Sequence, residues 1–211
     1  MNDITKLAAM LGLWAAFVPD ASATTIAPLS VEQMTDASDA IVRASVEDQW
    51  TDLDEEGRIT TYVNIHVTEV VKGDLEADDY MTIETHGGIL GDAISPVHMA
   101  ARYSADEEVV LFLCEKRFGT SWGTVGLALG KYTVRVNPQD GAEMVVNFNP
   151  PWTVDYDARF IPNPPLAERV SLRSFEDRIR ARVDLGWDGN PIPGVAPAHL
   201  RAINKLQPGV R

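Results

Sequence analysis

Three acidic residues at alternate positions could hold a calcium ion. Asp52, Asp54 and Glu56 are followed by Gly57, and oxygen ligands at the first, third and fifth places of a loop, with a glycine for the sharp turn, are the start of a calcium-loop pattern. The twelfth place is Val63 rather than a bidentate glutamate, and the flanking residues have strand patterns where this loop type needs helices. Two interpretations stay open: a weak calcium site that holds a turn together, and an acidic, solvated hairpin.

Ser121 belongs to a motif with possible nucleophilic chemistry. Residues 119–123 (GTSWG) match the G-x-S-x-G nucleophile elbow, and His86 begins an HGG segment upstream. Partners in the order Ser, Asp, His would be Asp184 or Asp188, and then His199. The elbow works only where a strand enters it and a helix leaves it within a parallel α/β sheet. Because a strand pattern follows Ser121, we expect a hairpin turn here and keep a small hydrolase as the enzymatic alternative.

Histidines could form a metal site only if the strands align them. With a hairpin turning near residue 76, His66 and His86 would lie opposite each other, with Glu84 nearby. A structural zinc site needs four ligands and a catalytic site three. The sequence has no H-E-x-x-H motif or paired cysteines to complete such a set, so surface histidines are the favoured interpretation.

The elements that position these residues are mainly β. Ser30 and Gln33 form a capping-box pattern that opens a short helix ending near residue 39. The hydrophobic period then becomes two, which is typical of an antiparallel sandwich or barrel. The predicted strands are 40–50, 58–71, 80–85, 109–114, 124–129, 131–136 and 143–148. Residues 87–106 show no clear period, and we expect a long surface excursion there.

The composition changes after the last predicted strand. Nine of the thirteen prolines lie between Pro150 and Pro208, which predicts a proline-rich arm over 149–211 that wraps a β-barrel domain of residues 24–148. One amphipathic helix interrupts the arm over about 171–185. Its apolar stripe is Leu172, Phe175, Ile179 and Val183, and its arginines off the stripe are Arg173, Arg178, Arg180 and Arg182.

Charge sets limits on partners. The chain has 45% apolar and 23% charged residues and a formal net charge of −13, so a folded domain is expected and a nucleic-acid binder is not. Residues 24–158 carry 8 basic and 24 acidic side chains, whereas residues 159–211 carry 9 and 5. The basic helix therefore either neutralises the acidic barrel, docks a partner or meets an anionic membrane surface.

The first 23 residues have the pattern of a signal peptide. An uncharged run over residues 7–18 follows Lys6 and precedes Ala21 and Ala23. Twelve residues are too few to span a bilayer, and the small residues suit cleavage before Thr24. We expect a periplasmic or extracellular protein without a transmembrane segment. Its single cysteine, Cys114, allows no intramolecular disulfide and lies in an apolar run typical of a buried thiol.

The opening of the predicted barrel resembles the netrin-like domain of the tissue inhibitors of metalloproteinases. The segment from Ser38 to Val46 is similar to the family's A-D-x-V-x-x-A-x-V pattern, and Lys72-Gly73 follows a strand as the family's K-G does. The resemblance covers about residues 30–115 and implies an OB-like Greek-key antiparallel barrel. The family's N-terminal cysteine and its disulfides are absent, so the resemblance implies the barrel and a protein-binding habit but not zinc-directed inhibition.

These patterns together predict an exported, non-catalytic β-barrel module, with a short N-terminal helix and one C-terminal helix, that binds a protein or an extracellular ligand. Three alternatives stay open. They are the small hydrolase, a structural envelope protein that binds calcium through Asp52, Asp54 and Glu56, and a binder similar to the metalloprotease inhibitors. The sequence predicts no cofactor other than calcium.

Overall fold

The computed structural model describes residues 29–97, 99–115, 121–147 and 169–196. In these ranges the elements are α2 (Val31–Ala37), β1 (Ala40–Leu53), β2 (Ile59–Lys72), β3 (Tyr80–His86), β4 (Gly88–Leu90), β5 (Ala93–Ser95), β6 (Glu108–Glu115), β7 (Trp122–Thr124), a 3-10 helix (Leu127–Gly130), β8 (Lys131–Val136), β9 (Glu143–Val146), β10 (Arg169–Ser171) and α3 (Leu172–Leu185). The predicted signal peptide, residues 149–168 of the predicted arm, and His199 lie outside the described residues.

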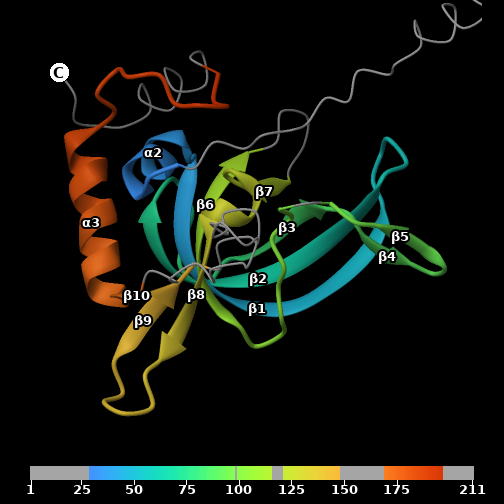
Figure 1. Ribbon diagram of the computed structural model, residues 1–211, viewed down its shortest axis with the longest axis horizontal. Coiled ribbons are helices and arrows are strands. Elements are labelled where there is room, and N and C mark those ends of the chain that lie inside the picture. The colour runs from blue at the N-terminus through green and yellow to red at the C-terminus, as the bar shows by residue number, and fades with distance from the viewer. Residues whose placement is uncertain (1–28, 98, 116–120, 148–168, 197–211) are drawn as a thin grey trace, which may run out of the picture.

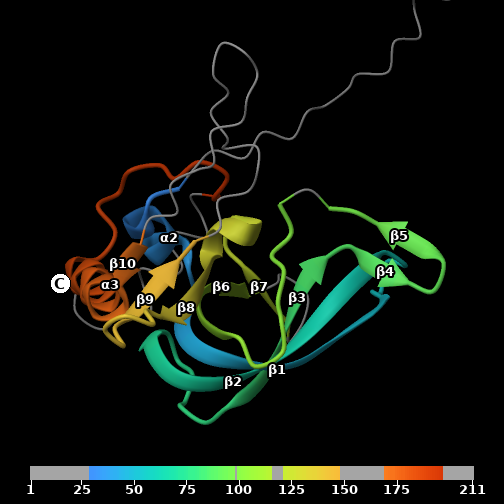
Figure 2. The same ribbon diagram turned by 60° about the horizontal axis from the view of Figure 1, so that its bottom comes forward.

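Five strands form a ring. The order is β1-β2-β3-β7-β6, and β6 returns to pair with β1 (Figure 2). A ring with an odd number of strands cannot alternate direction throughout, so one neighbouring pair must be parallel. That pair is β3–β7, joined at Ile83 and Trp122. The mainly β fold is as expected, but the expectation of purely antiparallel pairing is wrong at this position.

Two apolar cores occupy the two sides of this sheet. The inner core fills the ring and includes Val42, Ile65 and Leu111. The outer core lies between the ring and the layer formed by α2, α3 and the β8-β9-β10 extension, and includes Phe112 and Phe175. Because β6 contributes to both cores, both of its faces are apolar, as the run before Cys114 indicates.

Both α-helices of the described residues begin with a side-chain cap, and the cap of α2 was predicted from the sequence. Ser30 accepts a hydrogen bond from Gln33 N, and the Gln33 side chain accepts one from Ser30 N, which completes the capping box. Ser171 caps α3 in a similar way through Ser174 N. The predicted stripe of α3 packs inward, with Phe175 and Ile179 in the outer core. Among the described residues no helix is long and apolar enough to cross a membrane.

Two sequence-based expectations fail after β3. The strand predicted over 124–129 ends at Thr124 and gives way to the 3-10 helix, because Gly126 and Leu127 adopt left-handed backbone angles, with φ of 62° and 59°. The predicted surface excursion over 87–106 contains the β4–β5 hairpin and then buries alternate side chains at Met99, Ala101 and Tyr103.

Candidate functional site: a cavity beside the β4–β5 hairpin

A cavity of about 870 Å³ opens where the β1–β2 hairpin, the end of β3 and the β4–β5 hairpin meet. Residues 49–51, 61, 85–89, 94–97 and 100–103 line it. Figure 1 shows the β4–β5 hairpin at the end of the molecule opposite α3. The volume lies within the range usual for ligand pockets.

The floor of the cavity is polar because β1, β2 and β3 each place a threonine there, namely Thr51, Thr61 and Thr85. Deeper in the barrel the inward side chains of these strands are aliphatic. The hydroxyls of Thr51 and Thr61 lie 3.1 Å apart, and Thr61 Oγ1 donates to Gly87 O at 2.7 Å. A hydroxyl that donates keeps acceptor capacity, so the floor can accept hydrogen bonds from a ligand.

Gly88 allows the β4–β5 hairpin to approach this floor closely. Its φ is 145°, and a Cβ added there would lie 2.5 Å from Thr61 Oγ1 and 2.8 Å from Thr51 Cγ2. A side chain at this position would therefore push the hairpin away from the two threonines. The glycine pair at residues 87 and 88 has a positional role that the sequence alone did not reveal.

Residues 100–103 form the wall of the cavity that faces β1. Contacts on the side of this segment away from the cavity hold it in place. Tyr103 is buried, and its ring lies 5.0 Å from Lys131 Nζ. Glu107 accepts hydrogen bonds from Lys131 Nζ at 2.8 Å and from Thr133 Oγ1 at 2.5 Å. Burial alone would raise the pKa of Glu107, but these donors lower it below its usual value. The wall thus has a fixed, charge-paired support.

The rim of the cavity is apolar and exposed. Ile89 and Ile94 form a cross-strand pair in the β4–β5 hairpin with 65% and 69% of their surfaces exposed. Val97 also lines the cavity and is partly exposed. Trp50 borders the cavity, but its ring stacks on Tyr62 on the outer face of the β1–β2 pair, with centroids 5.4 Å apart. A concentration of exposed aliphatic side chains around a cavity is typical of a binding site.

The acidic hairpin that predicts calcium binding lies at the tip of β1 and β2. Asp54 accepts hydrogen bonds from the backbone and guanidinium of Arg58, which lower its pKa, and Glu56 also pairs with Arg58. Asp52 accepts from Leu53 N at 2.7 Å. Across the described ranges no three His, Cys, Asp or Glu side chains are grouped to hold a metal ion. Calcium binding by these residues stays a prediction, and one arginine, Arg58, already pairs with two of the three carboxylates.

The alignment of His66 with His86 that a metal site would need is wrong, whereas the favoured interpretation of separate histidines is not contradicted. His66 pairs with Tyr80, and His86 pairs with Thr60, so the two imidazoles lie at opposite ends of the β2–β3 pair. The pairs Thr60–His86 and His66–Tyr80 centre the β2–β3 hairpin near residue 73 and not near residue 76, which shifts the register from the one expected. Glu84 lies opposite Tyr62 rather than between the histidines.

Ser121 directly precedes β7, and that strand is followed by a 3-10 helix after two intervening residues. In the described residues that follow Ser121, a strand and not an α-helix leaves the serine, whereas a nucleophile elbow needs a helix there. Asp188 accepts a hydrogen bond from Asn190 N at 3.0 Å and pairs with Arg182. His199, the histidine of the predicted set, lies outside the described residues, so the hydrolase alternative stays a prediction.

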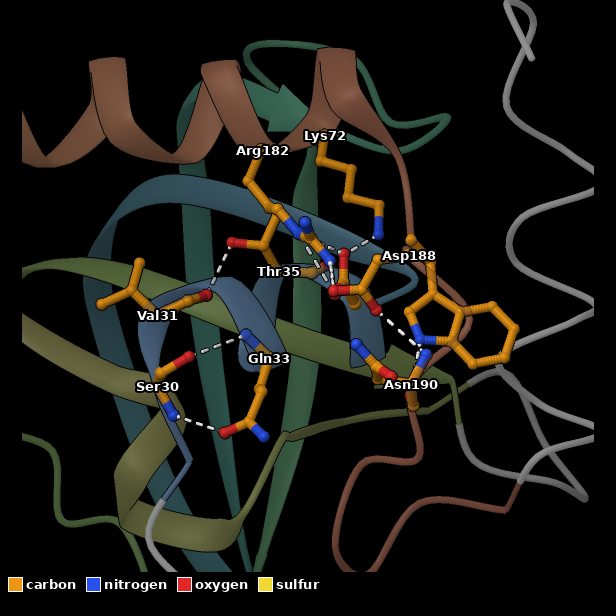
Figure 3. Close-up of polar contacts among 10 residues, drawn as sticks. Ser30, Val31, Gln33, Thr35, Lys72, Arg182, Asp188 and Asn190 are labelled. Atoms are coloured by element: carbon orange, nitrogen blue, oxygen red, sulfur yellow. Dashed lines mark hydrogen bonds and ion pairs between the residues drawn. The ribbon is translucent and has the colours of Figure 1, made fainter.

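The opposite end of the molecule uses its cations internally. Lys72 Nζ donates to Thr35 O at 2.6 Å (Figure 3). It also donates to Ser38 O at 2.7 Å, and Arg182 pairs with Asp36 at 2.6 Å. Arg178 and Arg180 pair with Glu32 and Glu69. The interpretation that the basic helix neutralises the acidic barrel is therefore supported at three of its four arginines.

Sequence reasoning missed the cavity itself. It found the acidic tip and the paired glycines, but it treated the residues from 87 to 106 as a surface excursion. No local signal reveals it, because a register shift between Val46 and Asp48 changes which residues of β1 point inward. Only the register places Thr51, Thr61 and Thr85 side by side.

No protein-family model matches the chain, and no curated protein matches it either.

Proposed function

We propose that this protein is an exported, non-catalytic binding module that holds a segment of another protein in the cavity beside the β4–β5 hairpin. One observation carries the proposal: a large cavity, its polar floor and its exposed apolar rim lie together at one end of the molecule. Such rims are costly in water unless a partner covers them. The uncharged run and small residues at the N-terminus support export.

We also infer that the ring is an OB-like Greek-key barrel. Support comes from the strand order β1-β2-β3-β7-β6 with its return to β1, and from the single parallel pair, β3–β7. The β1–β2 loop and the segment after β3 then flank one end of the barrel, where folds of this type commonly bind ligands. The resemblance to the metalloprotease-inhibitor domain implies protein binding as well, although fold alone does not settle function.

The proposal is tested by site-specific photo-crosslinking in the cells that produce the protein. The photoreactive residue p-benzoylphenylalanine replaces Ile94, which is 69% exposed on the rim, or Val136, which is 62% exposed in β8 and away from the cavity. Both positions offer a similarly exposed aliphatic site in a strand. We expect a discrete protein adduct from position 94 and none from position 136.

A variant with a filled cavity provides the control. Ala100 lines the cavity, and Ala100→Trp would occupy it, so the adduct from position 94 should disappear in this background. Identical adducts from positions 94 and 136, or no adduct from either, would contradict the proposal.

A further inference from the structure

The second half of β1 has an edge that no described strand pairs, although the Gln49 side chain donates from Nε2 to Tyr103 O at 3.2 Å. β1 pairs with β2 as far as Leu53, but with β6 only as far as Ser45. Val46 makes the last backbone bonds to the segment that leads into β6. Beyond Val46, no strand in the described part of the chain pairs with this side of β1. A strand edge of this kind can accept another strand.

The direction of the backbone groups at this edge follows from the hairpin register. Asp54 N donates to Arg58 O at 2.9 Å, and hydrogen-bonded pairs alternate along an antiparallel ladder. In this register Trp50 bonds to β2, whereas the N–H and C=O groups of Gln49 and Thr51 point away from β2. Within the described ranges those groups have no backbone partner.

The two faces of this edge differ in chemistry. Gln49 and Thr51 line the cavity, next to the aliphatic rim formed by Ile89, Ile94 and Val97. Alternate residues of a strand point to opposite faces, so Asp48, Trp50 and Asp52 share the other face. An added strand would therefore place one set of side chains in the cavity and the other set beside carboxylates.

The charge around the edge selects a basic partner. Residues 47–56 contain six acidic side chains, and the nearby Arg58 already pairs with Asp54 and Glu56. Asp48 and Asp52 flank the exposed Trp50 ring on the outer face. Lysine or arginine side chains on an added strand would meet complementary charge there, and a guanidinium could also stack on the tryptophan.

We propose that the edge of β1 at Gln49 and Thr51 binds an extended basic segment of a partner protein as an added β-strand. The inference rests on the proposed function and names the partner's chemistry. Residues of the segment that lie opposite Gln49 and Thr51 are apolar and enter the cavity, and the residues between them are lysine or arginine. Backbone hydrogen bonds supply affinity, and the alternating side chains supply specificity.

Labelled octapeptides titrated against the full chain test this proposal by fluorescence anisotropy. The first alternates lysine and valine, and the second replaces every lysine with glutamate. Two further peptides carry N-methyl groups either on the valines or on the lysines. In the proposed register the valine N–H groups face β1 and the lysine N–H groups face solvent. We expect saturable binding of the lysine–valine peptide and of its N-methyl-lysine form.

The other two peptides should bind at least about tenfold more weakly, because one loses charge complementarity and the other loses several hydrogen bonds. Equal binding of the N-methyl-valine peptide would overturn strand addition. Equal binding of the glutamate peptide would overturn the basic partner, and absence of binding by all four peptides would overturn both.

Variants of the protein locate the site. Thr51→Pro removes an N–H that faces away from β2, so it should abolish peptide binding while the β1–β2 ladder is retained. Asp52→Lys should weaken binding about tenfold and more so at low salt. Asp140→Lys is its control, because Asp140 also accepts a local backbone bond, from Ala142 N, but lies in the β8–β9 turn. An equal loss with Asp140→Lys would overturn the assignment to this edge.

The peptide and crosslinking results separate the two proposals. A discrete adduct at position 94 with no peptide binding would refute the basic strand and leave the binding module intact. Failure of both would refute both.

Discussion

At the scale of single residues, Lys72 at the end of β2 and Gly73 after it each have a structural role. Its buried ammonium group donates to the carbonyls of Thr35 and Ser38, at the C-terminal end of α2, where helix carbonyls lack intrahelical partners. Gly73 follows with φ of 101°, and a Cβ added there would lie 2.8 Å from the Ala40 side chain. The pair thus fixes α2 against the start of β1.

The burial of Lys72 predicts a pH dependence of stability. Burial lowers the pKa of Lys72 to about 8, although Asp36 and Asp39 act to raise it. Between pH 8 and the unfolded value of 10.5 the unfolded chain binds more protons, so stability should rise with pH in this window and be unaffected by this group below it. We expect a gain of about 3 kcal/mol.

Urea unfolding of the wild type and Lys72→Met from pH 7 to pH 11 measures this effect. The wild-type free energy of unfolding should rise relative to that of the variant through the window. Parallel curves for the two proteins would show that folding does not lower the pKa of Lys72.

Arg58 leads to a prediction about calcium at the acidic tip. Since Asp54 and Glu56 both pair with Arg58, millimolar calcium should leave the melting temperature of the full chain unchanged relative to excess EDTA. Arg58→Gln should release the carboxylates and make a calcium-dependent rise detectable. A rise of several degrees in the wild type that Asp52→Ala abolishes would instead establish the calcium site.

At the level of elements, α3 is attached by ion pairs of unequal burial. Arg182 pairs with Asp36, and their side chains are 15% and 6% exposed, whereas Arg178 and Glu32 are 44% and 38% exposed. Removal of one partner from a buried pair leaves an uncompensated charge. Arg182→Ala should therefore cost about 3 kcal/mol or more, and Arg178→Ala less than about 1 kcal/mol.

Urea unfolding at pH 7 of the two arginine variants makes the comparison, and the variants are matched because both residues lie on α3 and contact α2. Equal losses would show that the burial of Asp36 does not govern the attachment of the helix.

Elements with strong local signals were predictable from the sequence. The capping box at Ser30 and the apolar stripe of α3 follow from short-range patterns, and they appear almost where expected. The cavity was not predictable, because it depends on which threonines the register aligns and on how closely Gly88 approaches them. The histidine register failed for the same reason: pairing between strands is set by long-range packing rather than by local composition.

On the scale of the whole molecule, the two ends have different roles. At one end, arginines and Lys72 bind α2 and α3 to the barrel, so the cations are used within the fold. At the other end, the cavity, the aliphatic rim and the acidic tip face solvent. One end of the acidic chain is therefore suited to binding a partner, and the contacts at the other end stabilise the fold.

Amide hydrogen exchange of the free protein, resolved to single residues by NMR, tests most directly whether the cavity lies beside an open strand edge. Exchange depends on whether each N–H is hydrogen-bonded in the native state. Trp50 and Asp52 should be protected, because in this register their N–H groups bond to β2, whereas Gln49 and Thr51 should exchange rapidly. Equal protection at all four amides would show that the edge is already covered and would contradict the account.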